Sequence, residues 1–190
     1  NSGAIVLNGE DVTNLPMHKR AVKGLSYLPQ EPSIFRKLSV ADNIALVCDT
    51  REDLSKQEKK ELVTHLLKEF GIEGVKDQLG YTLSGGERRR TEIARALASN
   101  PRFLLLDEPF AGIDPKAVYE IKLLITSLAS KGIGVLITDH NVRDTLAITT
   151  KGYIIVQGQL LASGSKKDLL ANEEAIRLYF GEDFSHGDEK

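Results

Sequence analysis

The fold is decided by one stretch of the chain, FLLLDEP at residues 103–109. Four consecutive apolar residues predict a strand that is buried on both faces, as in a parallel sheet covered by helices on each side. Two acids and a proline follow directly, so Asp107 and Glu108 leave this strand at its C-terminal end. Ligands bind at that edge in open α/β sheets. The stretch therefore predicts a parallel sheet with a functional edge.

Short apolar runs and helical patterns alternate on either side of this stretch, which is typical of parallel strands joined by crossover helices. The apolar runs predict further strands at residues 4–7, 25–28 and 134–138, and a hairpin at 152–162. The helical patterns fall at residues 54–70, 84–99, 115–130 and 173–180. Asp114 is expected to cap the third of these helices, with Pro115 at its first position.

Composition excludes several classes of protein. Of the 190 residues 41% are hydrophobic and 27% charged, which is enough apolar material for a folded core. A single cysteine, Cys48, excludes a disulfide framework and a multi-cysteine zinc site, and we expect it to be buried. The formal charge of −2 argues against a nucleic-acid binder, so the run of arginines at 88–90 is expected to face solvent or an interface. The longest apolar run, residues 44–48, is too short for membrane insertion.

Four short motifs carry side chains suited to phosphate chemistry. Ser84-Gly85-Gly86 opens a helix, where backbone N–H groups and the helix dipole favour phosphate, although an ordinary serine N-cap has the same pattern. Asp107 can hold magnesium and Glu108 can polarise an attacking water, unless the strand simply ends in a polar turn. The strand at 134–138 delivers His140 to the same edge, and Gln30 follows the strand at 25–28.

In this order the motifs resemble the ATP-binding cassette (ABC) ATPases over nearly the whole chain. The resemblance implies an α/β fold with an ABC-type P-loop NTPase core, in which a mostly parallel sheet is accompanied by antiparallel strands and an inserted helical lobe. We expect residues 1–38 to be part of the ATPase core and residues 39–95 to be the helical lobe with the signature motif. Residues 96–184 are then the rest of the core with a C-terminal hairpin and helices, and residues 185–190 a flexible tail.

The resemblance also implies roles for particular residues. The residues expected to act in catalysis are Glu108 as the base, His140 as the switch histidine and Gln30 of the Q-loop. Nucleotide is bound by Ser84, Gly85 and Gly86 of the signature motif and by Asp114 of the D-loop, and the metal by Asp107 and Gln30. The implied cofactors are ATP and Mg²⁺, and the implied partners are a second copy of the chain and transmembrane transporter subunits.

Within the family, the chain resembles ATPases that drive lipopolysaccharide export from the inner membrane of Gram-negative bacteria. Residues 27–40, 85–90, 138–146 and 179–184 carry this likeness, which implies that Phe35 and Arg36 face a groove for a partner helix. The protein is then expected to be cytoplasmic and held at the inner membrane by its partners. The ATPases of branched-chain amino-acid importers share much of this pattern and remain an alternative. ABC ATPases of DNA repair or translation form a second alternative. Those proteins usually carry coiled-coil insertions or a second cassette, and neither is visible in this sequence.

One family motif is absent. ABC ATPases hold the β- and γ-phosphates with a G-x-x-x-x-G-K-[ST] loop, yet none of the 16 glycines here is followed by lysine. We therefore expect an N-terminally truncated ABC domain, which is inactive alone and an ATPase as the full-length dimer. A non-catalytic fragment is the remaining alternative.

Overall fold

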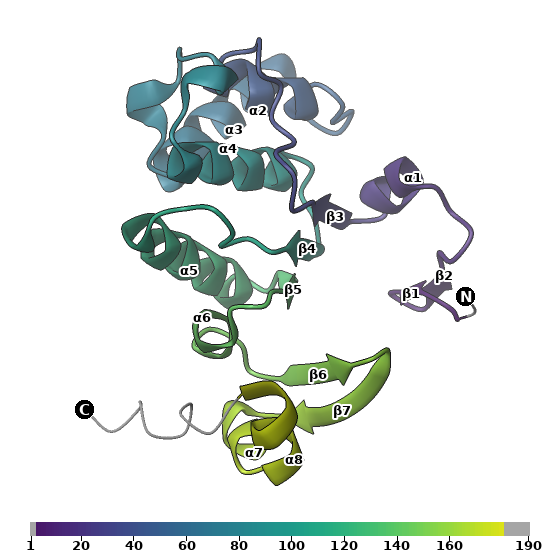
Figure 1. Ribbon diagram of the computed structural model, residues 1–190. Helices are drawn as coiled ribbons and strands as arrows, with labels where there is room; N and C mark the ends of the chain where they lie inside the picture. The colour runs from purple at the N-terminus through teal and green to yellow at the C-terminus, as the bar shows by residue number, and fades with distance from the viewer. Residues whose placement is uncertain (1–2, 181–190) are drawn as a thin grey trace. The chain divides into compact units, whose positions relative to one another are not determined.

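The computed structural model describes residues 3–180 (Figure 1). They fall into two compact units, with the division between Thr138 and Asp139. Within residues 3–180 no helix is both long and apolar enough to cross a membrane. The predicted tail at 185–190 lies outside the described residues, and the predicted domain boundaries remain predictions.

The first unit is built on a three-stranded parallel sheet in the order β3-β4-β5. Its strands are β3 (Leu25–Leu28), β4 (Phe103–Asp107) and β5 (Gly134–Thr138), as the sequence predicts. A small antiparallel pair, β1 (Val6–Leu7) and β2 (Glu10–Asp11), precedes them, so the strand predicted at 4–7 is shorter than expected. The predicted combination of parallel and antiparallel strands is confirmed.

Only one face of the parallel sheet is fully buried. Leu28, Leu104 and Leu106 are each at most 1% exposed on that face, where the Ser26 hydroxyl donates to the carbonyl of Ala96 on a covering helix. On the opposite face, Tyr27 pairs with Leu105 and Leu105 with Leu136. Tyr27 is 47% and Leu136 56% exposed, and Leu105 of β4 between them is only half-buried. The prediction that β4 is buried on both faces is therefore wrong for the described residues.

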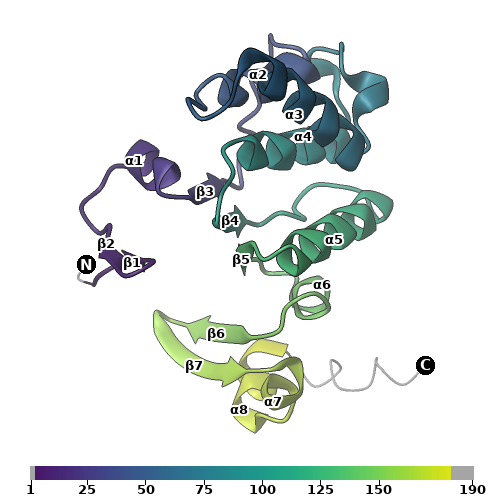
Figure 2. The same cartoon turned by 180° about the vertical axis from the view of Figure 1, so that it is seen from behind.

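Seven helical segments accompany this sheet within the first unit: α1 (Met17–Val22), α2 (Val40–Cys48), α3 (Lys56–Glu69), the 3-10 turns η1 (Glu73–Val75) and η2 (Gly80–Thr82), α4 (Gly85–Ala98) and α5 (Pro115–Ser130). Both views show α2, α3 and α4 gathered together (Figures 1 and 2), and α2 packs against the other two. Ile44, Phe70 and Ile93 are buried among them. Cys48 is buried, and Asp114 caps α5 ahead of Pro115, both as predicted.

The second unit contains the predicted hairpin of β6 (Gly152–Val156) and β7 (Gln159–Gly164). Gln157 and Gly158 both have positive φ at its turn. The helical segments of this unit are α6 (Val142–Leu146), α7 (Lys166–Leu170), α8 (Glu173–Ala175) and the π-helical turn η3 (Ile176–Phe180). The predicted helix at 173–180 is therefore α-helical only in its first turn. A small core of Leu146, Ile154, Ala162, Leu169 and Ala175 holds the unit together.

Candidate active site

Asp107 is held in place at the C-terminal edge of the parallel sheet by hydroxyls from both neighbouring strands. Thr138 Oγ1 donates to its Oδ1 at 2.6 Å, and the Tyr27 hydroxyl donates to its Oδ2 at 3.2 Å. Partial desolvation of its hydroxyl, together with this bond to Asp107, raises the pKa of Tyr27. An ionised carboxylate can accept about four hydrogen bonds, so Asp107 keeps lone pairs for a cation. Neither hydroxyl donor was among the predicted site residues.

Glu108 and Gln30, which are 78 positions apart in the chain, are in direct contact. Gln30 Nε2 donates to Glu108 Oε2 at 2.8 Å. The backbone of Glu108 has φ of 42°, in the left-handed region, and its N–H donates to the carbonyl of Thr138 at 2.7 Å. A non-glycine residue in this region costs on the order of 1–3 kcal/mol and persists only where its surroundings enforce it. The Glu108 backbone is thus held at the end of β4, where its carboxylate meets the Gln30 amide.

Arg89 is an exception to the prediction that the arginine run at 88–90 faces solvent or an interface. It lies on α4 and is only 6% exposed. Its guanidinium donates to the carbonyls of Pro29 at 3.0 Å, Asp107 at 2.9 Å and Pro109 at 3.3 Å. Burial lowers the pKa of Arg89 and the facing carboxylate of Glu92 opposes that shift. For Arg89 the prediction was wrong, because its i,i+3 pair with Glu92 lies on the buried side of α4, which the net charge of the chain does not reveal.

The signature motif begins α4 with a capping box. Ser84 Oγ accepts from the N–H of Glu87, and the Glu87 carboxylate accepts from the Ser84 N–H at 2.9 Å. The Ser84 hydroxyl also donates to Glu87 Oε2 at 2.6 Å. That bond, followed by the one from the Ser84 N–H, lowers the pKa of Glu87. The serine N-cap is therefore confirmed, while phosphate binding by Ser84, Gly85 and Gly86 remains a prediction.

Both signature glycines are packed against the D-loop segment and the start of α5. A Cβ on Gly85 would lie 3.1 Å from Ile113 Cγ2, and one on Gly86 would lie 2.7 Å from Ala117 Cβ. Glycine is needed here because the backbones approach closely. Asp114 accepts from the N–H of Ala117 at 3.0 Å, so its carboxylate caps α5 and its nucleotide contact stays a prediction.

His140 belongs to the second unit, where its Nδ1 lies 3.9 Å from Asp139 Oδ1. Its side chain is 74% exposed, whereas that of Asp139 is 1% exposed. The Asp139 carboxylate accepts from the N–H of Asn141 at 2.7 Å, which shapes the turn that carries the histidine. The role of His140 at the γ-phosphate remains a prediction.

Phe35 is presented on the surface by a buried asparagine. Asn43 exchanges two hydrogen bonds with the backbone of Phe35, at 2.9 and 3.1 Å. The Phe35 ring is 47% exposed and lies 5.0 Å from the guanidinium carbon of Arg95. Arg36 follows it and is exposed. Partner docking at these two residues remains a prediction.

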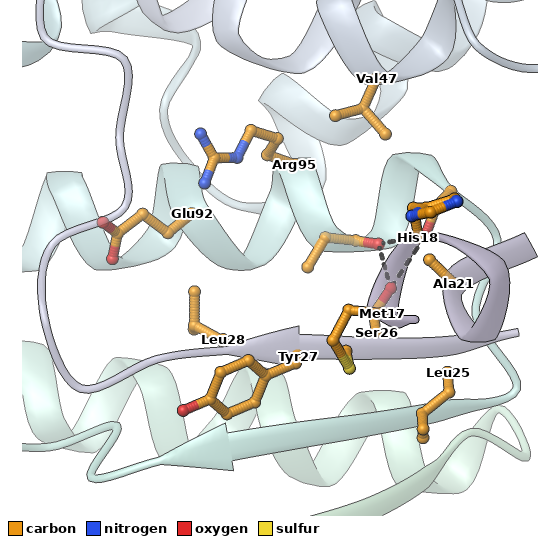
Figure 3. Close-up of a pocket in the computed structure, with 12 residues that line it drawn as sticks. Met17, His18, Ala21, Leu25, Ser26, Tyr27, Leu28, Val47, Glu92 and Arg95 are labelled. Carbon is orange, nitrogen blue, oxygen red and sulfur yellow. Dashed lines mark hydrogen bonds between the residues drawn. The ribbon is translucent and has the colours of Figure 1, made fainter. Parts of the chain in front are cut away.

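Arg95 also lines an open cavity of about 370 Å³. Figure 3 shows the cavity, with Met17 of α1, Tyr27 of β3 and Val47 of α2 also among the residues that line it. Arg95 Nη2 donates to Ser33 Oγ at 2.7 Å, on the loop between Gln30 and Phe35. The same side chain therefore touches the cavity, the Phe35 ring and the loop that leads to Gln30.

The oxygen atoms of Asp107 and Gln30 suit a cation whose other ligands come from a phosphate. Within residues 3–180 no cluster of three or more His, Cys, Asp or Glu side chains could hold a metal ion. Asp107 and Gln30 instead offer a carboxylate and an amide oxygen at the sheet edge. Magnesium commonly binds through one or two such oxygens plus substrate phosphates and water, so these residues fit it.

Residues 1–111 match the ABC transporter family, which is more than half of the chain, and the chain therefore belongs to this family. The family and the fold predicted from the sequence are thus confirmed. Its ATPase subunits bind and hydrolyse ATP, and they work as dimers with transmembrane partners.

Similar curated proteins include the lipopolysaccharide export system ATP-binding protein LptB of Haemophilus influenzae. It is 53% identical over 182 residues, which is 96% of this chain and 76% of that protein. LptB of Escherichia coli K12 is 53% identical over 183 residues, with the same coverage.

Two solved structures also match. The ADP conformation of the ATP-binding cassette MJ1267 has a TM-score of 0.79 at 26% identity, over 96% of this chain and 78% of that one. The cbiO1 subunit from Clostridium perfringens has a TM-score of 0.79 at 28% identity, over 93% and 71%.

Proposed function

We propose that this chain belongs to the ATP-hydrolysing subunit of a transporter that extracts lipopolysaccharide from the inner membrane. The observation that carries the chemistry is the 2.8 Å contact between Gln30 and Glu108, beside Asp107 at the sheet edge. The cargo is supported by 53% identity to proteins named for lipopolysaccharide export, over 96% of the chain. A branched-chain amino-acid importer is not favoured, because the matching relatives whose names state a cargo are named for lipopolysaccharide export, while others at 52% and 54% identity have names that state none.

Glu108 would act as the general base. Its carboxylate accepts a proton from the water that attacks the γ-phosphate, while Gln30 holds the carboxylate in position by donating from Nε2. Asp107 and the amide oxygen of Gln30 would hold magnesium. When bound, magnesium offsets the negative charge that develops on the phosphate oxygens.

The subunit would work as a homodimer at the cytoplasmic side of the inner membrane, held there by transmembrane subunits. Ser84, Gly85, Gly86 and Asp114 of one copy would complete the nucleotide site of the other, and His140 would contact the γ-phosphate. Because the site is divided between two copies, bound ATP stabilises the dimer, and hydrolysis of the ATP lets the two copies separate. Phe35 and Arg36 would receive a helix of the transmembrane subunits.

Glu108→Gln in the whole protein tests the chemistry. The amide keeps the shape of the side chain but cannot take a proton, so hydrolysis should fall about 10²–10⁴-fold while ATP still binds. Glu73→Gln, at an exposed glutamate in η1, is the matched control. Near-normal turnover by Glu108→Gln would show that Glu108 is not the base.

The cargo is tested in bacteria depleted of their own lipopolysaccharide-export ATPase. The whole protein should restore growth and lipopolysaccharide at the cell surface, and Glu108→Gln should not. A well-expressed, ATP-hydrolysing protein that co-purifies with the export subunits yet fails to restore export would contradict the proposed cargo.

A further inference from the structure

We infer that Arg89 and Glu92 form a buried positioning pair. This pair fixes the positions of the two backbone segments that carry Gln30 and Glu108. This inference rests on the catalytic roles proposed for those two side chains. The pair lies on α4, the helix that begins at the signature motif, and so it connects three segments of the first unit.

Arg89 contacts the chain next to each proposed catalytic side chain. It donates to the carbonyl of Pro29, the residue before Gln30, and to the carbonyls of Asp107 and Pro109, the residues on either side of Glu108. The guanidinium is a rigid, planar fork with five N–H donors, which lets one side chain reach three carbonyls at once. One group therefore fixes the spacing between the two segments.

Glu92 holds the other end of the loop that carries Gln30. Its Oε1 accepts from the N–H of Ser33 at 2.7 Å and of Ile34 at 3.1 Å, while its Oε2 faces Arg89 Nη1 at 3.4 Å. Glu92 is 2% exposed. A buried charge is retained only when it is paired and its hydrogen bonds are satisfied, and here both conditions hold. The loop from residue 29 to 34 is thus held at both ends by one ion pair.

The strained backbone of Glu108 has to be held by its neighbours, and Arg89 contacts both of them. Its φ of 42° persists only if its neighbours are held. Arg89 holds both flanking carbonyls, and the Glu108 N–H is bound to Thr138. Loosening Arg89 would let the carboxylate leave its place beside Gln30 without removing either catalytic group.

Arg89→Lys in the whole protein is the central test. Lysine keeps the charge beside Glu92 but carries a compact ammonium that cannot bridge the three carbonyls. We expect kcat to fall about 10–100-fold, since misplacement by about 1 Å can cost 10²-fold, with the Kd for ATP little changed. Arg88→Lys, at the half-buried neighbouring arginine, should stay within about twofold. Amide hydrogen exchange of residues 107–110 should become faster in Arg89→Lys and not in Arg88→Lys.

A double-mutant cycle separates positioning from general destabilisation. In a Glu108→Gln background, Arg89→Lys should lower the residual single-turnover rate far less than it lowers the normal rate, because the group it positions is already gone. Equal reductions in both backgrounds, or a kcat matching that of Arg88→Lys, would overturn the inference.

Two further results keep the test decisive. If Arg89→Lys does not fold, Glu92→Gln carries the same test, because it keeps an acceptor for Ser33 and Ile34 while weakening the hold on Arg89. It should lower kcat in the normal background and not in the Glu108→Gln background, and additive losses would overturn the inference. Normal turnover by Glu108→Gln itself would refute the proposed base, and this inference with it.

Discussion

Gly86→Ala is expected to force α4 and α5 apart at the ends that carry the signature motif and the D-loop. The new Cβ would lie 2.7 Å from Ala117 Cβ, whereas non-bonded carbons prefer about 3.5–4.0 Å. Neither atom can rotate away, because each is attached directly to its backbone. Ala117 is 5% exposed, so one helix has to move by about 1 Å.

The cost follows from two opposing effects. Overpacking of a tight interior costs about 1–3 kcal/mol, and alanine in place of glycine returns up to about 1 kcal/mol of helix propensity. We therefore expect the free energy of unfolding to fall by about 1–2 kcal/mol in urea denaturation of the whole protein. Gly74→Ala is the matched control, because a Cβ there would meet nothing within 4 Å.

A second substitution decides whether the clash is the cause. Ala117→Gly removes the atom that Gly86→Ala would strike, so the double variant should be more stable than the sum of the single losses by at least about 0.5 kcal/mol. Strictly additive losses, or a Gly86→Ala protein as stable as Gly74→Ala, would refute the reasoning.

Two other predictions concern the signature cap and the proposed docking residue. The pKa of Glu87 is lowered by its bonds to Ser84, so their contribution to stability is present above the ordinary carboxyl pKa and is lost as the pH falls through the lowered one. Ser84→Ala should thus cost about 1 kcal/mol at pH 7 and progressively less at acidic pH, and a loss independent of pH would contradict this. Phe35→Ala should weaken binding to the transmembrane subunits by about 2–4 kcal/mol in co-purification, with ATP hydrolysis by the isolated subunit unchanged. Tyr119→Ala, at an exposed tyrosine on α5, is its control, and loss of both binding and hydrolysis would show that Phe35 packs the domain.

The elements with strong local signals were predictable. The strands at 25–28 and 134–138 and the helix at 115–130 follow from apolar runs, apolar spacing and the Asp114 cap. The exposed face of the sheet was not predictable from the apolar run at 103–106, because burial depends on what packs against Leu105 and Leu136 and not on their own hydrophobicity. Local patterns determine an element; its surroundings decide which face is buried.

The residues of the candidate site likewise divide into those with a local sequence signal and those that depend on tertiary structure. Asp107 and Glu108 are visible in the sequence, because acids that directly follow a buried strand are an unusual pattern. The hydroxyls of Tyr27 and Thr138 are not, since their bonds to Asp107 depend on the order and register of three strands. Arg89 could have been found from its i,i+3 spacing to Glu92, but its three carbonyl partners come from two segments that are distant in the sequence.

The connection between β3 and β4 has a consequence for how the first unit folds. These strands are hydrogen-bonded neighbours, yet residues 29–102 lie between them. Closing a flexible loop of that length costs about 4 kcal/mol of chain entropy before any strand pairing compensates for it. Helices α2, α3 and α4 shorten this connection once they form and pack, because α2 contacts both α3 and α4 and less flexible chain is left to close. We therefore expect the helices to form early and the pairing of β3 with β4 to set the folding rate.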